Sequence, residues 1–359
     1  MLRKAAQDPA YDDPRFAEIE TAIPHRRLEA WKWTDVRRAL GAKPEGLSAA
    51  LTPEFRDGAS EPADVQVTQA QVSDVHPMNA VFEAFGQDAY KVVIPAGADG
   101  GTLTVSSLER GNGAVRVELG AGAKLKLVEL HEGEADTFIN ADFEIDLAEG
   151  AELSRILIQD DAATTVRIAT ATITLAEGAK LKQHILATGA ALSRLETHIR
   201  VEGEGVEVEA NGAYLLEGSR HADLTTLVVL NAPDATIRQT VRGVVTDKAR
   251  GVFQGKFLVQ REAQHTDAEM RHDALMLSDR SEVRAKPELE IYADDVACAH
   301  GNTIGQLDES ALFYMRQRGI PEAEARALLV EAFVASAFDG SGESEQLSRR
   351  VRDWLDGVT

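Results

Sequence analysis

The sequence predicts a mainly β protein, built as a solenoid of stacked β-coils with a helical region at each end. The first observation is an internal repeat: the motif Leu-x-x-Gly-Ala-x-Leu begins at Leu119, Leu147 and Leu175, so its copies lie 28 residues apart. The second is the alternation of apolar residues between copies, as in TATITLAEGAKLKQHIL, which is typical of strands. Two short strands and two turns fit one period.

The fixed period favours a solenoid over an antiparallel sandwich. A single coil cannot bury its own apolar face, whereas a stack of coils can. A sandwich also gives many short strands, but it gives no reason for a constant spacing. The repeat places glycines at the expected turns, at Gly122, Gly150 and Gly178, and a weaker fourth copy adds Gly205.

Residues 1–88 are expected to form a mainly helical N-terminal region, followed by the β-helix core at 89–307. The stretch AEIETAIPHRRLEAWKWTDVRRAL has apolar residues near helical spacing on both sides of Pro24. PADVQVTQAQVSDV alternates weakly and predicts an extended segment, and HPMNAVFEAFGQDA predicts a short helix.

Residues 308–359 are expected to form a C-terminal helical region of three helices. Asp308 or Ser310 suits the N-cap of the first helix, and Gly319 suits its end. Pro321 is expected in the first turn of the second helix, where proline is favoured. The wide apolar stripe that follows, up to Phe338, indicates ordinary core more readily than a face for docking a partner.

Composition excludes several classes of partner. The chain has 359 residues and a formal net charge of −21, with a pI of about 4.9. Phosphate backbones and anionic lipids require clustered Lys and Arg, so we expect no nucleic acid and no membrane as partner. A single cysteine allows no internal disulfide and fits a reducing compartment. Without an apolar signal core or a run of roughly 18 apolar residues, a soluble cytoplasmic protein is expected.

Motifs of common enzymes are missing from the sequence. GVFQGKF, at residues 251–257, lacks the Gly-x-x-x-x-Gly-Lys-Ser/Thr spacing of a phosphate loop, so no nucleotide hydrolysis by this chain is expected. There is also no Gly-x-Ser-x-Gly, no His-Glu-x-x-His and no dinucleotide fingerprint.

The densest polar cluster, HTDAEMRHD, begins at His265. In a strand, His265, Asp267 and Glu269 would share one face, and His272 and Asp273 complete the set of potential metal ligands. A solvated strand edge and turn explains the same residues without a metal, and this is the interpretation we favour.

The only cysteine, Cys298, lies two residues before His300 in the stretch ADDVACAHGNT. In a strand the two side chains point the same way, about 6.6 Å apart along the strand. They could share a ligand, but a closed structural zinc site needs four ligands. Further ligands would have to come from elsewhere, such as another subunit. Packing alone remains the alternative, because a free cysteine often behaves as a small hydrophobe.

Two stretches, one near each end of the chain, resemble a known family, and because the repeat lies between them the resemblance covers nearly the whole chain. KPELEIYADDVACAHGNTIGQLDESALFYMRQRGI, at residues 286–320, is similar to the signature of the D-type subunit of the SUF iron–sulfur cluster assembly scaffold, the SufB/SufD family. IPHRRLEAWKWTDV, at residues 23–36, is similar to its Pro-x-x-Arg-x-Glu-x-Trp-Lys-Tyr-Thr pattern, with Trp33 at the Tyr position. B-type chains carry Glu at the position of Gly301 and hold more cysteines, so the D type is favoured. Asn302 departs from the family, in which Ala is expected.

The resemblance implies a right-handed parallel β-helix flanked by helical regions, and a scaffold with no catalytic activity of its own. It implies pairing with a SufB-like subunit and with a SufC-like ABC-type ATPase, which would bind the ATP. A homodimer is possible for the chain alone. It implies no permanently held cofactor, but a transient iron–sulfur cluster shared with the B-type subunit. Carried over by residue, His300 and Cys298 are the expected ligands of transient iron or cluster. Phe313, Tyr314 and Arg318 are the expected contacts to the ATPase.

Two other readings stay open on the residues alone. One is a β-helix enzyme acting on carbohydrates, which needs acid and base carboxylates along a groove. The other is a purely structural β-helix oligomer, in which Cys298 and His300 are packing residues.

Overall fold

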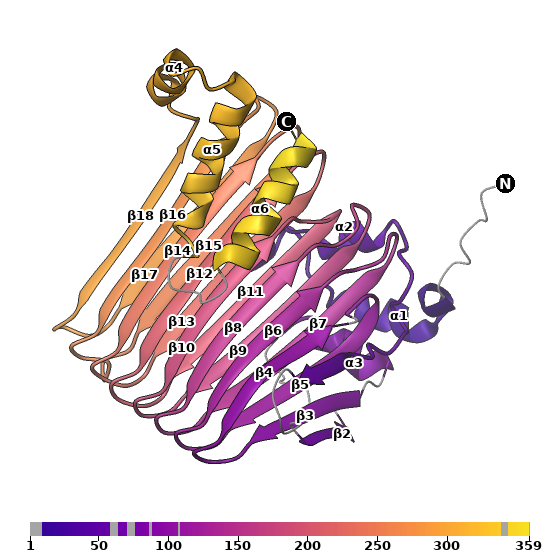
Figure 1. Cartoon of the computed structure of the whole chain (residues 1–359). Coiled ribbons are helices and arrows are strands. Elements are labelled where there is room, and N and C mark those ends of the chain that lie inside the picture. The colour runs from indigo at the N-terminus through magenta and orange to yellow at the C-terminus, as the bar shows by residue number, and fades with distance from the viewer. Residues whose placement is uncertain are drawn as a thin grey trace.

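The computed structural model of the chain describes residues 9–57, 64–69, 76–85, 88–106, 108–338 and 344–358. Within them, strands from alternate positions in the chain form two nine-stranded sheets that face each other as a solenoid (Figure 1). Sheet I has the order β1-β4-β6-β8-β10-β12-β14-β16-β18, and sheet II has the order β17-β15-β13-β11-β9-β7-β5-β3-β2. Each coil therefore gives one strand to each sheet.

Neighbouring strands along the solenoid pair in parallel, and only β1 with β4 and β2 with β3 pair antiparallel among the described residues. This confirms the predicted parallel β-solenoid with helices at its ends. The strands are β1 Glu54–Asp57, β2 Asp64–Gln69, β3 Asp88–Ile94, β4 Asp99–Ser106, β5 Gly111–Leu119, β6 Lys124–His131, β7 Phe138–Leu147, β8 Glu152–Gln159, β9 Val166–Leu175, β10 Lys180–Ala187, β11 Leu192–Val201, β12 Glu207–Leu216, β13 His221–Leu230, β14 Thr236–Val245, β15 Arg250–Val259, β16 Asp267–Met276, β17 Glu282–Ile291 and β18 Ala297–Gly305.

The repeat glycines are required by the turns. Gly122, Gly150, Gly178 and Gly205 have φ of 66°, 64°, 62° and 68°, the left-handed region that favours glycine. An added Cβ would meet nothing within 4 Å at any of the four, so the backbone conformation and not space selects glycine there. The 28-residue period thus repeats one turn geometry.

The solenoid core is a set of inward-facing rows. Because side chains alternate along a strand, residues paired across parallel strands continue one row from coil to coil. One such row runs through Leu125, Leu153, Leu181 and Val208, all of which are buried. Both sheets contribute rows of this kind to one continuous apolar core.

The N-terminal region packs on the outer face of sheet II. Buried Trp31 and Val36 from this region form a cluster with Phe138 and Ile168 of that sheet. The expected short helix and extended segment are present as α3 and β2, whereas the stretch around Pro24 forms short pieces. The elements are η1 Pro9–Asp12, α1 Pro14–Ile19, η2 Glu29–Trp31, α2 Val36–Leu40 and α3 Asn79–Phe85.

The C-terminal region packs on the outer face of sheet I (Figure 1). It contains α4 Glu309–Gln317, α5 Glu322–Ala335 and α6 Ser344–Val358. Asp308 caps α4, and its carboxylate accepts from the backbone N–H of Ser310 at 2.8 Å. The sequence predicted Pro321 in the first turn of α5. In the structure it lies one position earlier, as the N-cap of this helix.

The apolar stripe of α5 is mainly core, as the sequence favoured. Val334 and Phe338 are buried against the sheet, in one cluster with Ile156 and Leu186. Leu328, in contrast, is 43% exposed, so one side of the helix stays in solvent.

Candidate functional site

The signature residues lie on β18, the last strand of sheet I. β18 pairs in parallel with β16, and no described strand lies beyond it. Cys298 is opposite Ala268, and His300 is opposite Met270. The register therefore places both side chains in inward-facing rows, at the end of the solenoid where the stack of coils stops.

The position at the open end explains the exposure of these two residues. Equivalent residues in earlier coils are buried by the next coil, as Ala268 and Met270 are. His300 has no such cover and is exposed, while Cys298 is half-buried. The end of the solenoid thus presents an imidazole and a thiol from neighbouring inward rows.

The thiol of Cys298 is protonated at neutral pH in the isolated chain. Burial raises the pKa of Cys298 above its ordinary value, and the charge of Asp267 adds to this effect, while a backbone hydrogen bond at Ala268 opposes it. A metal or cationic group would have to lower the pKa before the sulfur became a good ligand.

The described residues contain no group of three or more His, Cys, Asp and Glu side chains placed to hold a metal ion. His300 and Cys298 alone are too few for a closed metal site. The arrangement suits ligation shared with a second chain, and it does not suit a metal ion held by this chain alone.

The structure separates the members of the polar cluster HTDAEMRHD. β16 begins at Asp267, and His265 lies in the preceding turn, with its Nδ1 3.1 Å from Asp295, which agrees with the favoured interpretation of a strand edge and turn. Asp267 and Glu269 are exposed on one face of the strand. Asp273 is buried in ion pairs with Arg271 and Arg242.

His272 is a structural residue. Its ring is buried and stacks on Phe253, with a centroid distance of 4.7 Å. Its Nδ1 is 2.7 Å from Oδ1 of Asn302, and its Nε2 is 2.9 Å from the hydroxyl of Tyr214. Burial lowers the pKa of His272 to about 4, so the ring is neutral at pH 7. Asn302, the departure from the family pattern, thereby fixes β18 to the coil beneath it.

The predicted ATPase contacts lie together on α4 and at its C-cap, Arg318. Phe313 and Tyr314 are 64% and 58% exposed, the highest values among the large apolar side chains described. The guanidinium of Arg318 lies 4.8 Å from the centroid of the Tyr314 ring, and Nη2 donates to its hydroxyl at 2.6 Å. Together they form an exposed patch, which we call the α4 patch.

A buried ionic network inside the solenoid was missed by reasoning from the sequence. Arg155 donates to both carboxylate oxygens of Glu129, at 2.6 and 2.9 Å, and to the side-chain oxygen of Gln183 at 2.6 Å. Farther along, Arg167 forms two hydrogen bonds to Asp161. The sequence could have indicated this network, because Arg155 is a charged residue at a position of an alternating strand where an inward-facing apolar residue is expected.

Comparison with known proteins identifies the family. The SufBD core domain of the SUF system for FeS cluster assembly matches residues 104–333, more than half of the chain. The chain belongs to this family, whose match covers most of the solenoid and reaches α5.

Within the family, two of the similar proteins are named as SufD. The iron–sulfur cluster assembly protein SufD of Escherichia coli is 34% identical over 177 residues, which are 48% of this chain and 42% of that protein. SufD of Bacillus subtilis is 29% identical over 140 residues, or 39% of this chain and 32% of that protein. An assembly protein of the SufBD family from Synechocystis is 37% identical over 151 residues, or 42% of this chain and 33% of that protein.

These matches confirm the resemblance to SufD-type assembly proteins. The aligned part spans less than half the length of each of these relatives. Among the helices that the structure describes, none is long and apolar enough to cross a membrane.

Proposed function

We propose that the chain is a non-catalytic scaffold subunit that pairs with a SufB-like chain and forms iron–sulfur clusters at the shared interface. The observation that carries this proposal is the placement of His300 and Cys298 on β18, whose outer edge pairs with no described strand, at the open end of the solenoid. The cluster is cargo, which this chain holds only in part.

The open end is suited to association with another β-chain. β17 and β18 are the last strands of sheets II and I, so both have one unpaired edge. Unpaired edges favour strand pairing with a partner. Exposed Ile291, Tyr292 and Ile304 add apolar surface at the same end. In the absence of a SufB-like partner, a second copy of this chain could occupy the end as a homodimer.

The ligands fit a labile cluster. Imidazole and thiolate both bind iron, and the half-buried thiol becomes a ligand only when a metal lowers its pKa. A cluster held by two ligands from this chain, with the rest from its partner, could be handed on when the interface changes.

The C-terminal helices support the expected docking of a SufC-like ATPase, which would bind the ATP. The α4 patch is exposed, while the rest of the C-terminal region is anchored on sheet I by buried residues. Aromatic and arginine side chains are the residue types most often found at the centres of interfaces.

A reconstitution experiment tests the proposal. The chain is mixed with a SufB-like subunit, and complex formation is measured by analytical ultracentrifugation. Ile304→Lys, on β18, is expected to weaken the complex at least about ten-fold, since it places a charge in the contact. Leu28→Lys is the matched control, because Leu28 is 41% exposed and Ile304 is 42% exposed. Equal affinity of the two variants would show that the interface lies elsewhere.

A further inference from the structure

A cavity of about 830 Å³ lies between the N-terminal region and sheet II, away from β18. One wall is the segment from Trp33 to Glu45, and the other follows the turns before successive strands of sheet II. Its volume is in the range of small-molecule sites. The turn residues that line it come from five consecutive coils: Asp136, Thr164, Ala191, Ser219 and Lys248.

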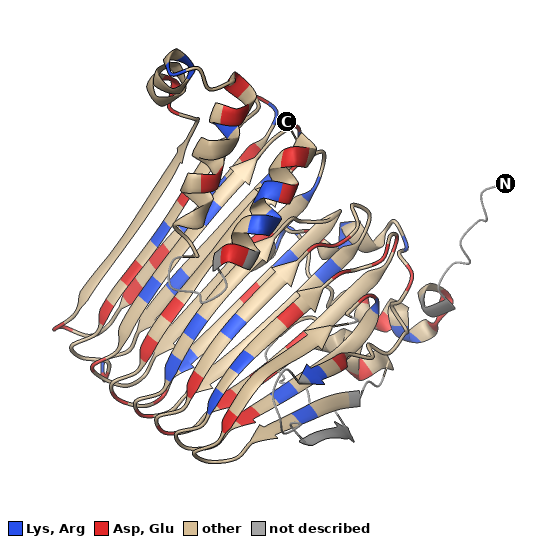
Figure 2. Cartoon of the chain, in the orientation of Figure 1, with Lys and Arg blue, Asp and Glu red and all other residues tan. Residues whose placement is uncertain are grey.

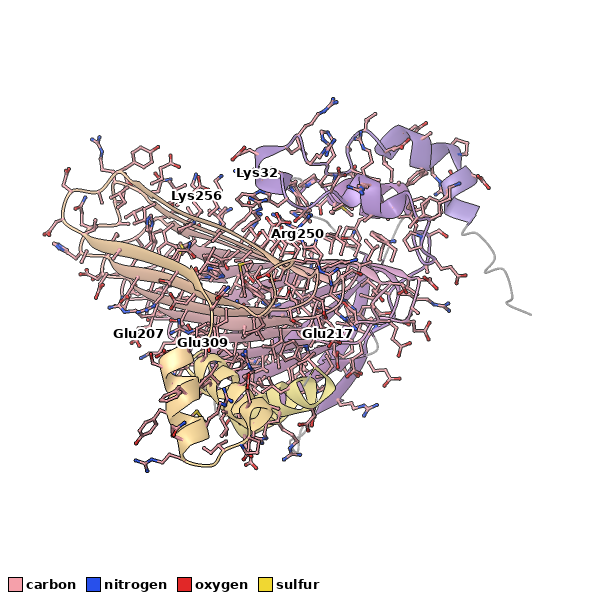
Figure 3. All side chains as sticks on the ribbon, turned by 90° about the horizontal axis from the view of Figure 1, so that it is seen from above. Lys32, Glu207, Glu217, Arg250, Lys256 and Glu309 are labelled. Atoms are coloured by element: carbon pink, nitrogen blue, oxygen red, sulfur yellow. The ribbon has the colours of Figure 1, made fainter. Side chains whose placement is uncertain are left out.

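Cationic residues line the cavity on both walls. Arg38 and Lys43 come from the N-terminal wall, and Lys248 and Arg250 come from the wall of turns. Figure 3 shows Arg250 on the side of the solenoid where the N-terminal helices lie, opposite Glu207 and Glu309. The lining also contains three carboxylates, so its four cationic residues leave it with a formal charge of +1. The chain as a whole has a net charge of −21. The carboxylates are Asp35, Glu45 and Asp136.

Most of these cations have no carboxylate partner among the described residues. The side chains of Arg38, Lys43 and Lys248 form no ion pair or hydrogen bond with any described residue, whereas Arg250 is paired with Glu282 at 2.9 Å. Lysines elsewhere on the solenoid commonly pair with a glutamate of the next coil, as Lys180 does with Glu207 at 2.7 Å. Figure 2 shows such charges of both signs side by side on the strands.

A buried imidazole in the cavity lining adds an unused hydrogen-bonding group. His221 lies in the lining, is 9% exposed, and has no hydrogen-bond partner for its Nε2 among the described residues. Burial lowers the pKa of His221 to about 4, so the ring is neutral at pH 7. A buried polar atom without a partner is unusual in a folded protein and indicates a missing water or ligand.

We propose that this cavity binds a small phosphate-bearing anion, with Arg38 and Lys43 facing Lys248 and Arg250 across a diphosphate group. Guanidinium and ammonium groups are the usual partners of phosphate oxygens. The three carboxylates leave an excess of one positive charge, so micromolar to millimolar affinity is expected. The site does not depend on the cluster chemistry at β18, because its residues lie on other strands.

Isothermal titration calorimetry of the full chain with inorganic pyrophosphate tests the proposal. We expect the chain to bind pyrophosphate. Lys248→Glu should weaken this binding about ten-fold, which is a loss of about 1.4 kcal/mol of binding free energy. Lys182→Glu is the matched control, because Lys182 is an exposed lysine on β10 that has no ion pair with a described residue, and it makes the same change of charge. This control should change the affinity less than two-fold by the same measure.

Inorganic phosphate and ADP serve as further probes. Tighter binding of ADP than of pyrophosphate identifies a nucleotide as the source of the phosphates, and equal or weaker binding identifies a free diphosphate. Arg38→Gln, at an exposed position, is a second variant in case Lys248→Glu fails to fold. Absence of binding by all three probes, or equal weakening by Lys248→Glu and Lys182→Glu, would overturn the proposal.

Discussion

At the scale of single residues, the buried ion pair of Glu129 and Arg155 is a strong constraint on the solenoid. Both side chains are almost fully buried. Burial opposes ionisation of Glu129, but Arg155 and the nearby ring of His131, whose Nε2 lies 3.2 Å from the carboxylate, hold the pKa of this carboxyl below its usual value. The pair is therefore ionised inside the core.

Arg155→Met should destabilise the fold by about 3–5 kcal/mol, because it leaves the charge of Glu129 buried and unpaired. The double variant Glu129→Gln with Arg155→Met should recover most of this loss. Denaturant unfolding followed by circular dichroism measures both. If the single and double variants are equally destabilised, lost packing and not the unpaired charge is the cause.

The sequence predicted the structural role of residues that recur in each coil, such as the turn glycines, and missed the role of residues that occur in one coil only. The positive φ of the repeat glycines follows from a pattern that recurs every 28 residues. Arg155 has no counterpart in the repeat, since the next residues in its row are Gln183 and Ala210. Its partner can be found only when the register of the coils is known.

At the scale of elements, the N-terminal region is joined to sheet II by a titratable cluster. Asp142 on β7 lies near His76, and His76 and His198 both approach Glu196, with Nε2 distances of 3.6 and 2.7 Å. Burial raises the pKa of Asp142 to about 6, although His76 opposes the shift. Since the pKa in the folded state exceeds that of the unfolded chain, folding favours the protonated carboxyl.

Asp142 should therefore oppose folding most strongly above pH 6, and this cost should fall as the pH drops below 6 until it disappears below the ordinary pKa of 3.8. Asp142→Asn should raise the melting temperature at pH 8 and raise it by about half as much at pH 5. Thermal melting of both proteins from pH 5 to 8 measures the effect. An equal difference at every pH would contradict the assignment, and this comparison cancels the titration of histidines that both proteins share.

The α4 patch yields a second prediction at this scale. The double variant Phe313→Ala with Tyr314→Ala should weaken binding of the SufC-like ATPase by about 2 kcal/mol, or roughly 30-fold. Tyr292→Ala, an equally exposed aromatic on another surface, is the control. Surface plasmon resonance with the immobilised chain measures both. Unchanged affinity of the double variant would remove α4 from the docking surface.

Point variants are the cleaner test here, because deletion of residues 308–359 would uncover the apolar face of sheet I. Phe338 and Leu347 are buried there in one cluster with Leu186. The sequence predicted these helices and their stripe from periodicity. Which side of the stripe is covered depends on the sheet beneath it, which includes β8, β10, β12 and β14, much earlier in the chain.

At the scale of the whole molecule, the end of the solenoid at β17 and β18 leaves inward-facing side chains and strand edges uncovered. Every inward row is covered by the next coil until β17 and β18, where core side chains such as Val283 and Cys298 are only partly buried. The sequence identified the signature strand through its family resemblance. It could not show that the strand is terminal, because this follows from the number and order of the coils.

The account therefore depends on β18 as a shared, incomplete cluster site. The most direct test is the iron and acid-labile sulfide content of the reconstituted complex with a SufB-like subunit, for His300→Ala against the matched control His265→Ala. His265 is also an exposed histidine, but it lies in a turn outside β18. We predict that His300→Ala forms a complex of normal thermal stability but loses most of its iron and sulfide, and that Cys298→Ser loses less. Cluster content at the wild-type level in a stable His300→Ala complex would contradict the account, and Cys298 and His300 would then be packing residues at the end of the solenoid.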